Sequence, residues 1–178
     1  MSIKKKISVI GLGYVGLPLA VALSKTFEVV GFDKNESRVK ELNTHNDKTL
    51  EVTKKELKKA YNLKISSNQN DIAGSDIFIA TVPTPIDQKN NPDLTSLKLA
   101  SKIIASSLKK GSIIVYESTV YPGCTEEICI PILEKFSNLT FNKDFFVGYS
   151  PERINPGDKN HAIGDIVKII SASNKKSL

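Results

Sequence analysis

The sequence contains little cysteine, almost no arginine and no tryptophan. Its 178 residues include only two Cys, too few for the disulfide framework that stabilises small secreted domains. Beyond residue 24, no apolar run approaches the roughly 18–20 residues that a membrane-spanning helix needs. A chain of this length usually forms one domain of roughly 100–200 residues with a sizeable core. We therefore expect a single domain in the cytoplasm, with reduced thiols and no membrane contact.

Arginine is scarce even though the chain is basic. Lys and Arg total 25 against 19 Asp and Glu, a formal net charge of +6, yet only Arg38 and Arg153 are arginines. Proteins that bind nucleic acid usually gather arginine on one face, so we do not expect a nucleic-acid partner. The two histidines, His45 and His161, are far apart and have no companion ligands. The sequence therefore predicts no metal site.

The amino-terminal segment admits two interpretations. Three lysines at positions 4–6 precede an uncharged run over residues 7–24, which is the outline of a signal peptide. The run contains three glycines and a proline, however, and a helical signal sequence tolerates these residues poorly. We therefore favour a strand, a tight turn and a helix in this segment.

Short apolar runs alternate with longer segments of helical period along the chain. This alternation is typical of βαβ units and a parallel sheet. We therefore predict a Rossmann-type α/β fold, doubly wound, with a mostly parallel sheet and helices on both faces. The predicted strands span residues 7–10, 29–32, 63–66, 77–82, 112–116, 145–147 and 167–170, and the predicted helices span about 17–23, 37–42, 53–60, 94–108 and 125–135. Pro131 should kink or restart the last helix.

The segment between the first predicted strand and helix reads Gly11-Leu12-Gly13-Tyr14-Val15-Gly16. A Gly-x-Gly-x-x-Gly pattern in this position is typical of dinucleotide-binding folds. Gly11 permits the tight turn, Gly13 lets a pyrophosphate approach the backbone, and Gly16 lets the helix pack closely on the strand. The free N–H groups at the start of the helix then bind phosphate oxygens. An ordinary strand–helix turn that happens to contain glycines is the alternative.

An acidic residue, Asp33, ends the second predicted strand about 20 residues after the glycines, where a carboxylate accepts hydrogen bonds from the adenosine ribose. Such a carboxylate would repel the 2′-phosphate of NADP, so the sequence favours NAD as the cofactor. Lys34 and Arg38 lie near it, and basic residues are what NADP enzymes use there. The plainer interpretation of Arg38 is a residue on a solvated helix face.

Three further loops follow predicted strands, so each lies at the carboxyl edge of the sheet, where doubly wound folds bind ligands. The first, T-V-P-T-P, contains Thr84, which could hydrogen-bond the cofactor. The second, E-S-T-V-Y-P-G, places Ser118 and Thr119 at the same edge. In the third, S-P-E-R-I-N-P-G, Glu152 and Arg153 could serve as a base and as an anchor for an anionic substrate. Rigid connectors and a surface ion pair are the plainer alternatives.

Taken in order, the motifs G-L-G-Y-V-G-L-P-L-A, V-P-T-P, E-S-T-V-Y-P-G and S-P-E-R-I-N-P-G resemble the UDP-glucose/GDP-mannose dehydrogenase family. The resemblance covers essentially the whole chain, but only the N-terminal, NAD-binding domain of that family. The S-P-E-R sequence and the I-N-P-G-D that directly follows it look most like those of UDP-N-acetylhexosamine (galactosamine or glucosamine) 6-dehydrogenases of bacterial surface polysaccharide and capsule synthesis.

The resemblance implies a four-electron oxidation, in which the C6 alcohol of the sugar passes through an aldehyde to a carboxylate with two NAD and a cysteine thioester. It implies that Glu152 is the acid/base near the water that hydrolyses the thioester. The family's NAD contacts fall on Tyr14, Val15, Asp33, Arg38, Thr84 and Thr119, and its UDP-sugar contacts fall on Arg153 and Ile154. At Pro156 the sequence departs from relatives that carry a second glutamate, which puts a two-glutamate mechanism in doubt here.

The nucleophilic Cys of this family lies in a G-G-x-C-I-P-x-D motif, and a catalytic Lys precedes it on a connecting helix. Cys129 begins a partial match to that motif, but we interpret it as a small buried hydrophobe; Cys124, at a helix start, has a slightly greater chance of a lowered pKa. We expect residues 1–178 to be the NAD-binding domain alone, inactive without the central helix and C-terminal UDP-binding domain, and homodimeric at full length. The alternative is a self-contained dinucleotide-binding sensor or regulatory module.

Overall fold

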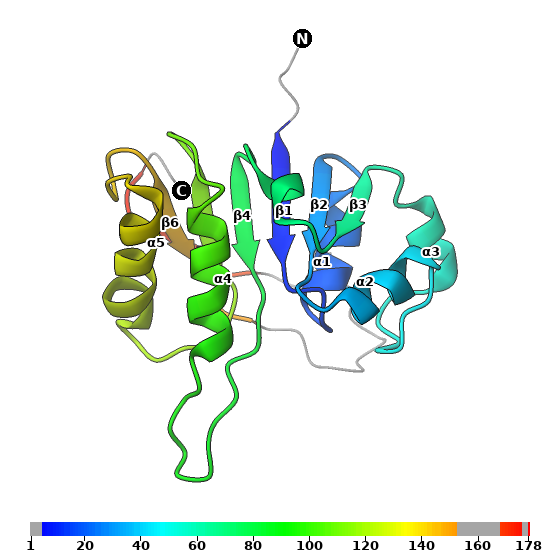
Figure 1. The fold of residues 1–178 in the computed structure, drawn as a ribbon, viewed down its shortest axis with the longest axis horizontal. Helices are drawn as coiled ribbons and strands as arrows, with labels where there is room; N and C mark the ends of the chain where they lie inside the picture. Colours follow the sequence, from blue (N-terminus) through cyan, green and yellow to red (C-terminus); the bar gives the residue numbers. More distant parts are fainter. Residues whose placement is uncertain (1–4, 153–167, 176–177) are drawn as a thin grey trace.

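A single seven-stranded sheet organises the molecule. The computed structural model describes residues 5–152, 168–175 and 178. The strands are β1 (Lys6–Ile10), β2 (Glu28–Phe32), β3 (Leu63–Ser66), β4 (Ile77–Ala80), β5 (Ile113–Tyr116), β6 (Phe146–Tyr149) and β7 (Ser171–Ala172). They lie in the order β3-β2-β1-β4-β5-β6-β7 (Figure 1). Every neighbouring pair is parallel except β6 and β7, which are antiparallel.

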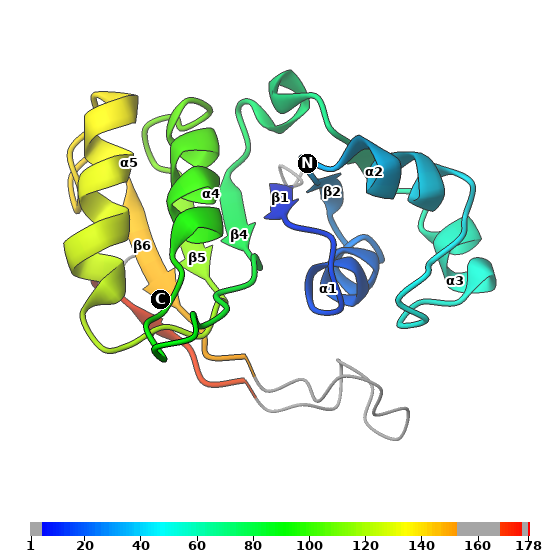
Figure 2. The same cartoon turned by 60° about the horizontal axis from the view of Figure 1, so that its bottom comes forward.

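Helices cover both faces of the sheet, as the sequence predicts (Figure 2). They are α1 (Gly16–Leu23), α2 (Glu36–Asn43), α3 (Lys54–Lys59), α4 (Thr95–Ala105) and α5 (Ile130–Ser137), with a short 3₁₀ turn, η1 (Gln69–Ile72), and a π-helical turn, η2 (Thr125–Cys129). Two buried apolar clusters result. One contains residues of α4, α5 and η1 with one face of the strands, and the other contains residues of α1, α2 and α3 with the opposite face. The Rossmann-type, doubly wound prediction is therefore confirmed.

The interior strand β1 is buried on both faces, as is typical of strands in a parallel sheet. Its side chains alternate between the two buried clusters: Val9 joins the cluster beneath α1, and Ile10 joins the cluster beneath α4. A strand buried on both faces must be apolar throughout or must satisfy its polar groups. Ser8 is fully buried, and its hydroxyl makes a 2.7 Å hydrogen bond with the Ser75 hydroxyl. The segment that shares the outline of a signal peptide thus forms the middle of the fold and helix α1.

The order of the strands reverses between β1 and β4. The chain winds from β1 through β2 to β3 at one edge, and then crosses back to place β4 on the other side of β1. Helices on either side of this reversal diverge, and a crevice opens at the carboxyl ends of the two strands. Ligands of doubly wound folds bind in that crevice.

The predicted last strand, over residues 167–170, is wrong for the described residues 168–170, which have no regular structure. The strand lies instead at Ser171–Ala172, which pair with Tyr149 and Gly148 of β6. Gly148 explains this register, because a Cβ at that position would lie only 2.9 Å from the Ser171 carbonyl oxygen. The glycine lets the returning chain approach β6 closely.

Two elements differ slightly from their predicted bounds: strand β4 and the last helix. Strand β4 ends at Ala80, two residues before the prediction. Thr81 still donates its N–H to the Ile10 carbonyl, and its hydroxyl donates to the Gly11 carbonyl, whereas Pro83 has no N–H to continue the ladder. The predicted helix over 125–135 begins as the π-helical turn η2 and continues as α5, with Pro131 in the first turn of α5. Pro lacks the N–H that would continue the hydrogen-bond ladder, so the predicted restart is confirmed.

Both cysteines are buried beside η2. Cys129 is 1% exposed, as predicted for a small apolar residue, and burial raises the pKa of its thiol to about 11. Burial also raises the pKa of Cys124, so the possible lowering by a helix start does not occur. No helix among the described residues has the length and apolarity required to cross a membrane.

Candidate functional site

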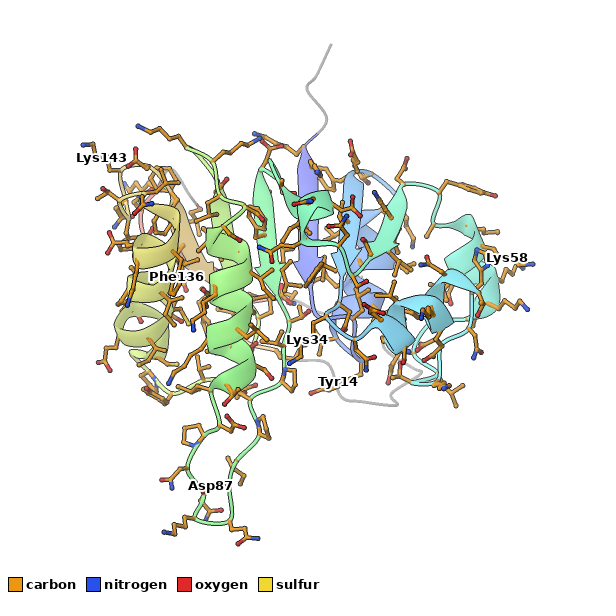
Figure 3. All side chains as sticks on the ribbon, in the orientation of Figure 1. Tyr14, Lys34, Lys58, Asp87, Phe136 and Lys143 are labelled. Carbon is orange, nitrogen blue, oxygen red and sulfur yellow. The ribbon has the colours of Figure 1, made fainter. Side chains whose placement is uncertain are left out.

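The candidate site occupies the crevice at the carboxyl ends of β1, β2, β4 and β5. Loops from all four strands meet there, and the glycine turn separates β1 from α1. Figure 3 shows Tyr14 and Lys34 at the same end of the molecule as the protruding loop of Asp87, which follows β4. The site is therefore where the strand reversal predicts ligand binding.

The three glycines of the turn are required to different degrees. Gly11 has φ of +97°, a conformation that residues with a Cβ rarely adopt, and its N–H donates to the Phe32 carbonyl at 2.8 Å. A Cβ at Gly16 would overlap the Gly11 carbonyl and the Thr81 hydroxyl. A Cβ at Gly13 would meet no heavy atom within 4 Å. Gly11 and Gly16 thus shape the turn, whereas Gly13 leaves open space beside the backbone.

The start of helix α1 has the features of an anion site. Its N-cap is Val15, which makes no side-chain capping hydrogen bond, and its first turn contains no acidic residue. The N–H groups at a helix start form the positive end of its dipole. In α1 the Leu17 N–H donates to the Gly13 carbonyl at 3.1 Å, and Pro18 has no N–H, so the groups that can face an anion are those of residues 13–16. With Gly13 open beside them, these N–H groups are suited to phosphate oxygens.

Thr81 is a structural residue of the site that the sequence analysis did not single out. Its hydroxyl lies 2.8 Å from the Gly11 carbonyl and 3.1 Å from the Ile10 carbonyl. The side chain is buried and packs where Gly16 approaches Gly11. The signal in the sequence was its position directly after an apolar strand, but only the parallel pairing of β1 and β4 places it beside the glycines.

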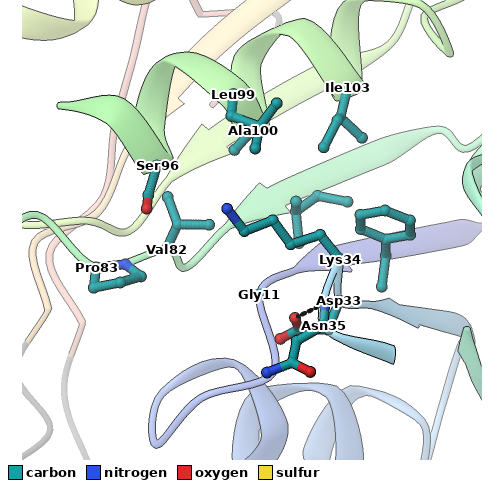
Figure 4. Close-up of a pocket in the computed structure, with 12 residues that line it drawn as sticks. Gly11, Asp33, Lys34, Asn35, Val82, Pro83, Ser96, Leu99, Ala100 and Ile103 are labelled. Carbon is teal, nitrogen blue, oxygen red and sulfur yellow. Dashed lines mark hydrogen bonds between the residues drawn. The ribbon is translucent and has the colours of Figure 1, made fainter. Parts of the chain in front are cut away.

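The Asp33 carboxylate is held at the end of β2 by two backbone N–H groups. One oxygen accepts from Leu12 N–H at 2.9 Å. The other accepts from Asn35 N–H at 2.9 Å (Figure 4). The carboxylate therefore joins the glycine turn to the start of α2. It keeps lone pairs for further donors, as recognition of two ribose hydroxyls would require.

Arg38 is not on a solvated helix face, so the plainer interpretation is wrong. Its side chain is 11% exposed and lies 2.9 Å from a Glu41 oxygen and 2.7 Å from an Asp47 oxygen. Its Nε donates to the Leu12 carbonyl at 3.0 Å. Asp33 and Arg38 thus bind the N–H and the carbonyl of the same residue, and together they fix the glycine turn.

An apolar cleft of about 260 Å³ lies between the end of β2 and helix α4 (Figure 4). Its walls come from the ends of β1, β2 and β4, and from one side of α4: Ile10, Gly11, Phe32, Asp33, Lys34, Asn35, Val82, Pro83, Ser96, Leu99, Ala100 and Ile103. A flat aromatic base next to a ribose on Asp33 fits these surroundings. The α4 residues were not predicted, because helical periodicity identifies a buried stripe without showing that its margin lines a cleft.

A second cleft, of about 150 Å³, lies on the other side of Val82 and Pro83. It brings together most of the remaining predicted site residues: Gly13, Tyr14, Val15, Thr84, Ser118, Thr119 and Glu152. The Ser118 hydroxyl donates to the Val82 carbonyl at 2.6 Å, and the Thr84 hydroxyl donates to the Thr119 carbonyl. These hydroxyls therefore connect neighbouring loops at the wall of the cleft.

Glu117 is a second residue that the sequence analysis named only as part of a motif. It is buried, lines the cleft with Glu152, and forms an ion pair with Lys168. Burial raises its pKa, and the nearby Glu152 carboxylate adds to that rise, whereas Lys168 opposes it. The pairing could not be predicted, because 51 positions separate the partners.

Two predicted residues, Arg153 and Ile154, lie outside the described residues, as does Pro156. Within the described part of the chain, no group of three or more His, Cys, Asp or Glu side chains could hold a metal ion.

The two clefts, the open glycine turn and the held carboxylate together fit a dinucleotide. The apolar cleft suits its adenine, Asp33 its ribose, and the start of α1 its diphosphate. The second cleft then has space for the other half of the molecule.

Comparison with known proteins gives a consistent picture. A model described as the UDP-glucose/GDP-mannose dehydrogenase family, NAD binding domain, matches residues 5–178. UDP-N-acetyl-D-glucosamine 6-dehydrogenase of Pseudomonas aeruginosa is 58% identical over 168 residues, which make up 94% of this chain and 40% of that protein. Protein CapL of Staphylococcus aureus is 54% identical over 94% of this chain and 39% of its own length.

Solved structures agree with the sequence relatives. The structure of UDP-D-ManNAc dehydrogenase from Pyrococcus horikoshii superposes with a TM-score of 0.88 at 32% identity, over 97% of this chain and 42% of that one. A ternary complex of GDP-mannose dehydrogenase from Pseudomonas aeruginosa gives a TM-score of 0.85 at 25% identity, over 96% and 42%. The chain thus spans about 40% of the length of the curated relatives it matches.

Proposed function

Because the chain belongs to the UDP-glucose/GDP-mannose dehydrogenase family, we propose that it is the NAD-binding domain of a nucleotide-sugar 6-dehydrogenase. The enzyme oxidises the C6 alcohol of a UDP-N-acetylhexosamine to the carboxylate of the uronic acid, with two NAD for each sugar. The observation that carries this proposal is the glycine turn, in which open space at Gly13 meets an uncapped helix start. The 58% and 54% identities to a UDP-N-acetyl-D-glucosamine 6-dehydrogenase and to CapL support the substrate class and a role in capsule or other surface polysaccharide synthesis.

Residues of the two clefts hold the cofactor in this proposal. Backbone N–H groups from Gly13 to Gly16 bind the diphosphate, and Asp33 accepts hydrogen bonds from the adenosine ribose. The remaining proposed NAD contacts come from side chains and backbone around the second cleft and from α2: Tyr14, Val15, Arg38, Thr84, Ser118 and Thr119. When bound, NAD accepts a hydride from C6 in each oxidation.

The S-P-E-R-I motif supplies the groups for the sugar in this proposal. Glu152 lines the second cleft beside Ser118 and Thr119, within the space available to the nicotinamide end of the cofactor. We assign Glu152 as the acid/base that moves a proton to or from the attacking water. Arg153 and Ile154 are assigned to the UDP-sugar on the family motif, with Arg153 as the anchor for phosphate.

The rest of the reaction requires groups that residues 1–178 do not supply. Both thiols of the chain are buried with raised pKa values, so neither suits a nucleophile. We propose that the nucleophilic Cys, the catalytic Lys and much of the sugar pocket lie in the part of the enzyme that corresponds to the unmatched 60% of the relatives. We also propose that the full-length protein is a homodimer. A self-contained regulatory module is not favoured, because relatives that match 94% of the chain are named dehydrogenases.

Titration of the purified chain with NADH, followed by an activity assay, tests the proposal. We expect saturable NADH binding and no NADH production from NAD with UDP-N-acetylglucosamine or UDP-N-acetylgalactosamine. A polypeptide extended to the length of the relatives should oxidise one of the two sugars. Absence of NADH binding would refute the cofactor assignment, and turnover by residues 1–178 alone would refute the division of catalytic groups.

A further inference from the structure

Glu41 and Asp47, the two acidic residues around Arg38, line neither of the two clefts. We propose that Glu41 and Asp47 determine the preference for NAD over NADP by holding the Arg38 guanidinium away from a ribose 2′-phosphate. This inference rests on the proposed function, because it concerns the dinucleotide that the glycine turn and Asp33 bind.

Arg38 lies close to Asp33, the carboxylate proposed to bind the ribose. Arg38 Nε donates to the Leu12 carbonyl at 3.0 Å, and Leu12 N–H donates to Asp33 at 2.9 Å. One residue therefore separates the guanidinium from the carboxylate that faces the ribose. An arginine near this carboxylate is the group with which dinucleotide-binding folds accommodate a 2′-phosphate.

The guanidinium is nevertheless directed toward protein carboxylates. Nη1 lies 2.9 Å from a Glu41 oxygen, and Nη2 lies 2.7 Å from an Asp47 oxygen. All three side chains are at most 11% exposed, so water screens these pairs much less than it would on the surface. One cation shared by two carboxylates leaves a net charge of −1, and Asp33 adds another negative charge beside it.

Glu41 and Asp47 form a clamp around Arg38, and Asp47 is itself held in place. Asp47 also accepts hydrogen bonds from the N–H groups of Thr49, Glu51 and Val52, at 3.0–3.1 Å. Hydrogen bonds from Thr49, Val52 and Arg38 outweigh burial and lower the pKa of Asp47, so it remains ionised near neutral pH. A 2′-phosphate would have to draw Arg38 away from two fixed anions to bind it.

The other nearby cation does not replace Arg38. Lys34 is exposed and extends along the apolar cleft toward Val82 and Ser96, whereas the Asp33 carboxylate lies on the opposite side of its backbone (Figure 4). Its flexible ammonium also lacks the forked geometry of a guanidinium for phosphate. The choice between the two cofactors therefore depends on Arg38 and its two partners.

Three variants of this chain test the inference. Glu41→Gln preserves size and hydrogen bonding but removes one charge from the clamp, and Asp47→Asn does the same on the other side. Glu36→Gln is the matched control, because this substitution removes the same charge from the exposed first turn of α2, away from Arg38. For each protein, the dissociation constants of NADH and NADPH are measured from cofactor fluorescence. The ratio of the two constants does not depend on the fraction of folded protein. Repulsion between Asp33 and the 2′-phosphate is the same in every variant, so it does not affect the comparison.

We expect Glu41→Gln to shift the ratio toward NADPH by about tenfold, as expected when a phosphate gains a charge-assisted arginine contact. Asp47→Asn should shift it in the same direction, and Glu36→Gln by less than about threefold. A shift no larger than that of the control in both clamp variants would overturn the inference while leaving NAD binding intact. If Glu41→Gln does not fold, Asp47→Asn decides alone. A wild-type chain that binds neither dinucleotide would overturn the proposed function together with this inference.

Discussion

Alanine at two glycines of the same turn should produce opposite phenotypes. In Gly16→Ala, the new Cβ would lie well under 3.0 Å from the Gly11 carbonyl and the Thr81 hydroxyl. Both neighbours are held in place, because the hydroxyl of the buried Thr81 side chain donates to that carbonyl at 2.8 Å. In Gly13→Ala, the Cβ would meet no protein atom within 4 Å and would instead fill the space through which a diphosphate reaches the backbone.

The magnitudes follow from these contacts. Overpacking at Gly16 costs roughly 1–3 kcal/mol, and displacing the Thr81 hydrogen bond adds about 1 kcal/mol, so the free energy of unfolding should fall by about 2–4 kcal/mol. Gly13→Ala should change it by less than about 1 kcal/mol, because alanine restricts the unfolded chain and meets no clash. The affinity of Gly13→Ala for NADH should fall at least about tenfold, or roughly 1.4 kcal/mol.

Urea unfolding followed by circular dichroism measures the first quantity, and NADH titration at a temperature where both variants are folded measures the second. The reasoning would be refuted if Gly16→Ala were as stable as the wild type. It would be refuted equally if Gly13→Ala bound NADH with unchanged affinity, because the space beside Gly13 would then not be the path of the diphosphate.

Other predictions concern charge and thiol chemistry. Asp33→Ser should weaken NADH binding about tenfold and NADPH binding less, because NADH has a free ribose diol that loses its acceptor, whereas NADPH has a phosphate at the 2′ position; titration with both cofactors checks this. Since hydrogen bonds lower the pKa of Asp47 below 3.8 in the folded state, its ionised form stabilises the fold above that pH, and the stabilisation is lost as the pH falls further. The stability difference between wild type and Asp47→Asn should accordingly shrink below about pH 4 in urea titrations. Cys124 and Cys129 should not react with a disulfide reagent at pH 8 until the chain is unfolded, because both thiols are buried with raised pKa values.

Local sequence patterns predicted most of the fold. Alternation of apolar runs gives six of the seven strands to within a few residues, because strands buried on both faces must be continuously apolar. The last strand was misplaced, since Lys168-Ile169-Ile170 looks as strand-like as its neighbours. Its true position depends on the close approach that Gly148 allows, and that contact joins segments far apart in the sequence.

The candidate site divides in the same way. Gly11, Gly16 and Asp33 were predictable, because their roles depend on the turn and strand to which they belong. Thr81, Glu117 and the clamp around Arg38 were not, because each contact joins different loops or elements: Thr81 meets Gly11, Glu117 meets Lys168, and Arg38 meets Asp47. Long-range pairing of polar groups leaves no periodic pattern in a sequence.

The central claim is that backbone N–H groups at the start of α1 bind the diphosphate of NAD. An NMR titration of the ¹⁵N-labelled chain with NAD tests it most directly, since each amide reports separately. The largest shift changes should occur at the amides of residues 13–16, with smaller changes at Asp33 and along the Ser96–Ile103 side of α4. Saturable binding that leaves the amides of residues 13–16 unperturbed would contradict the claim.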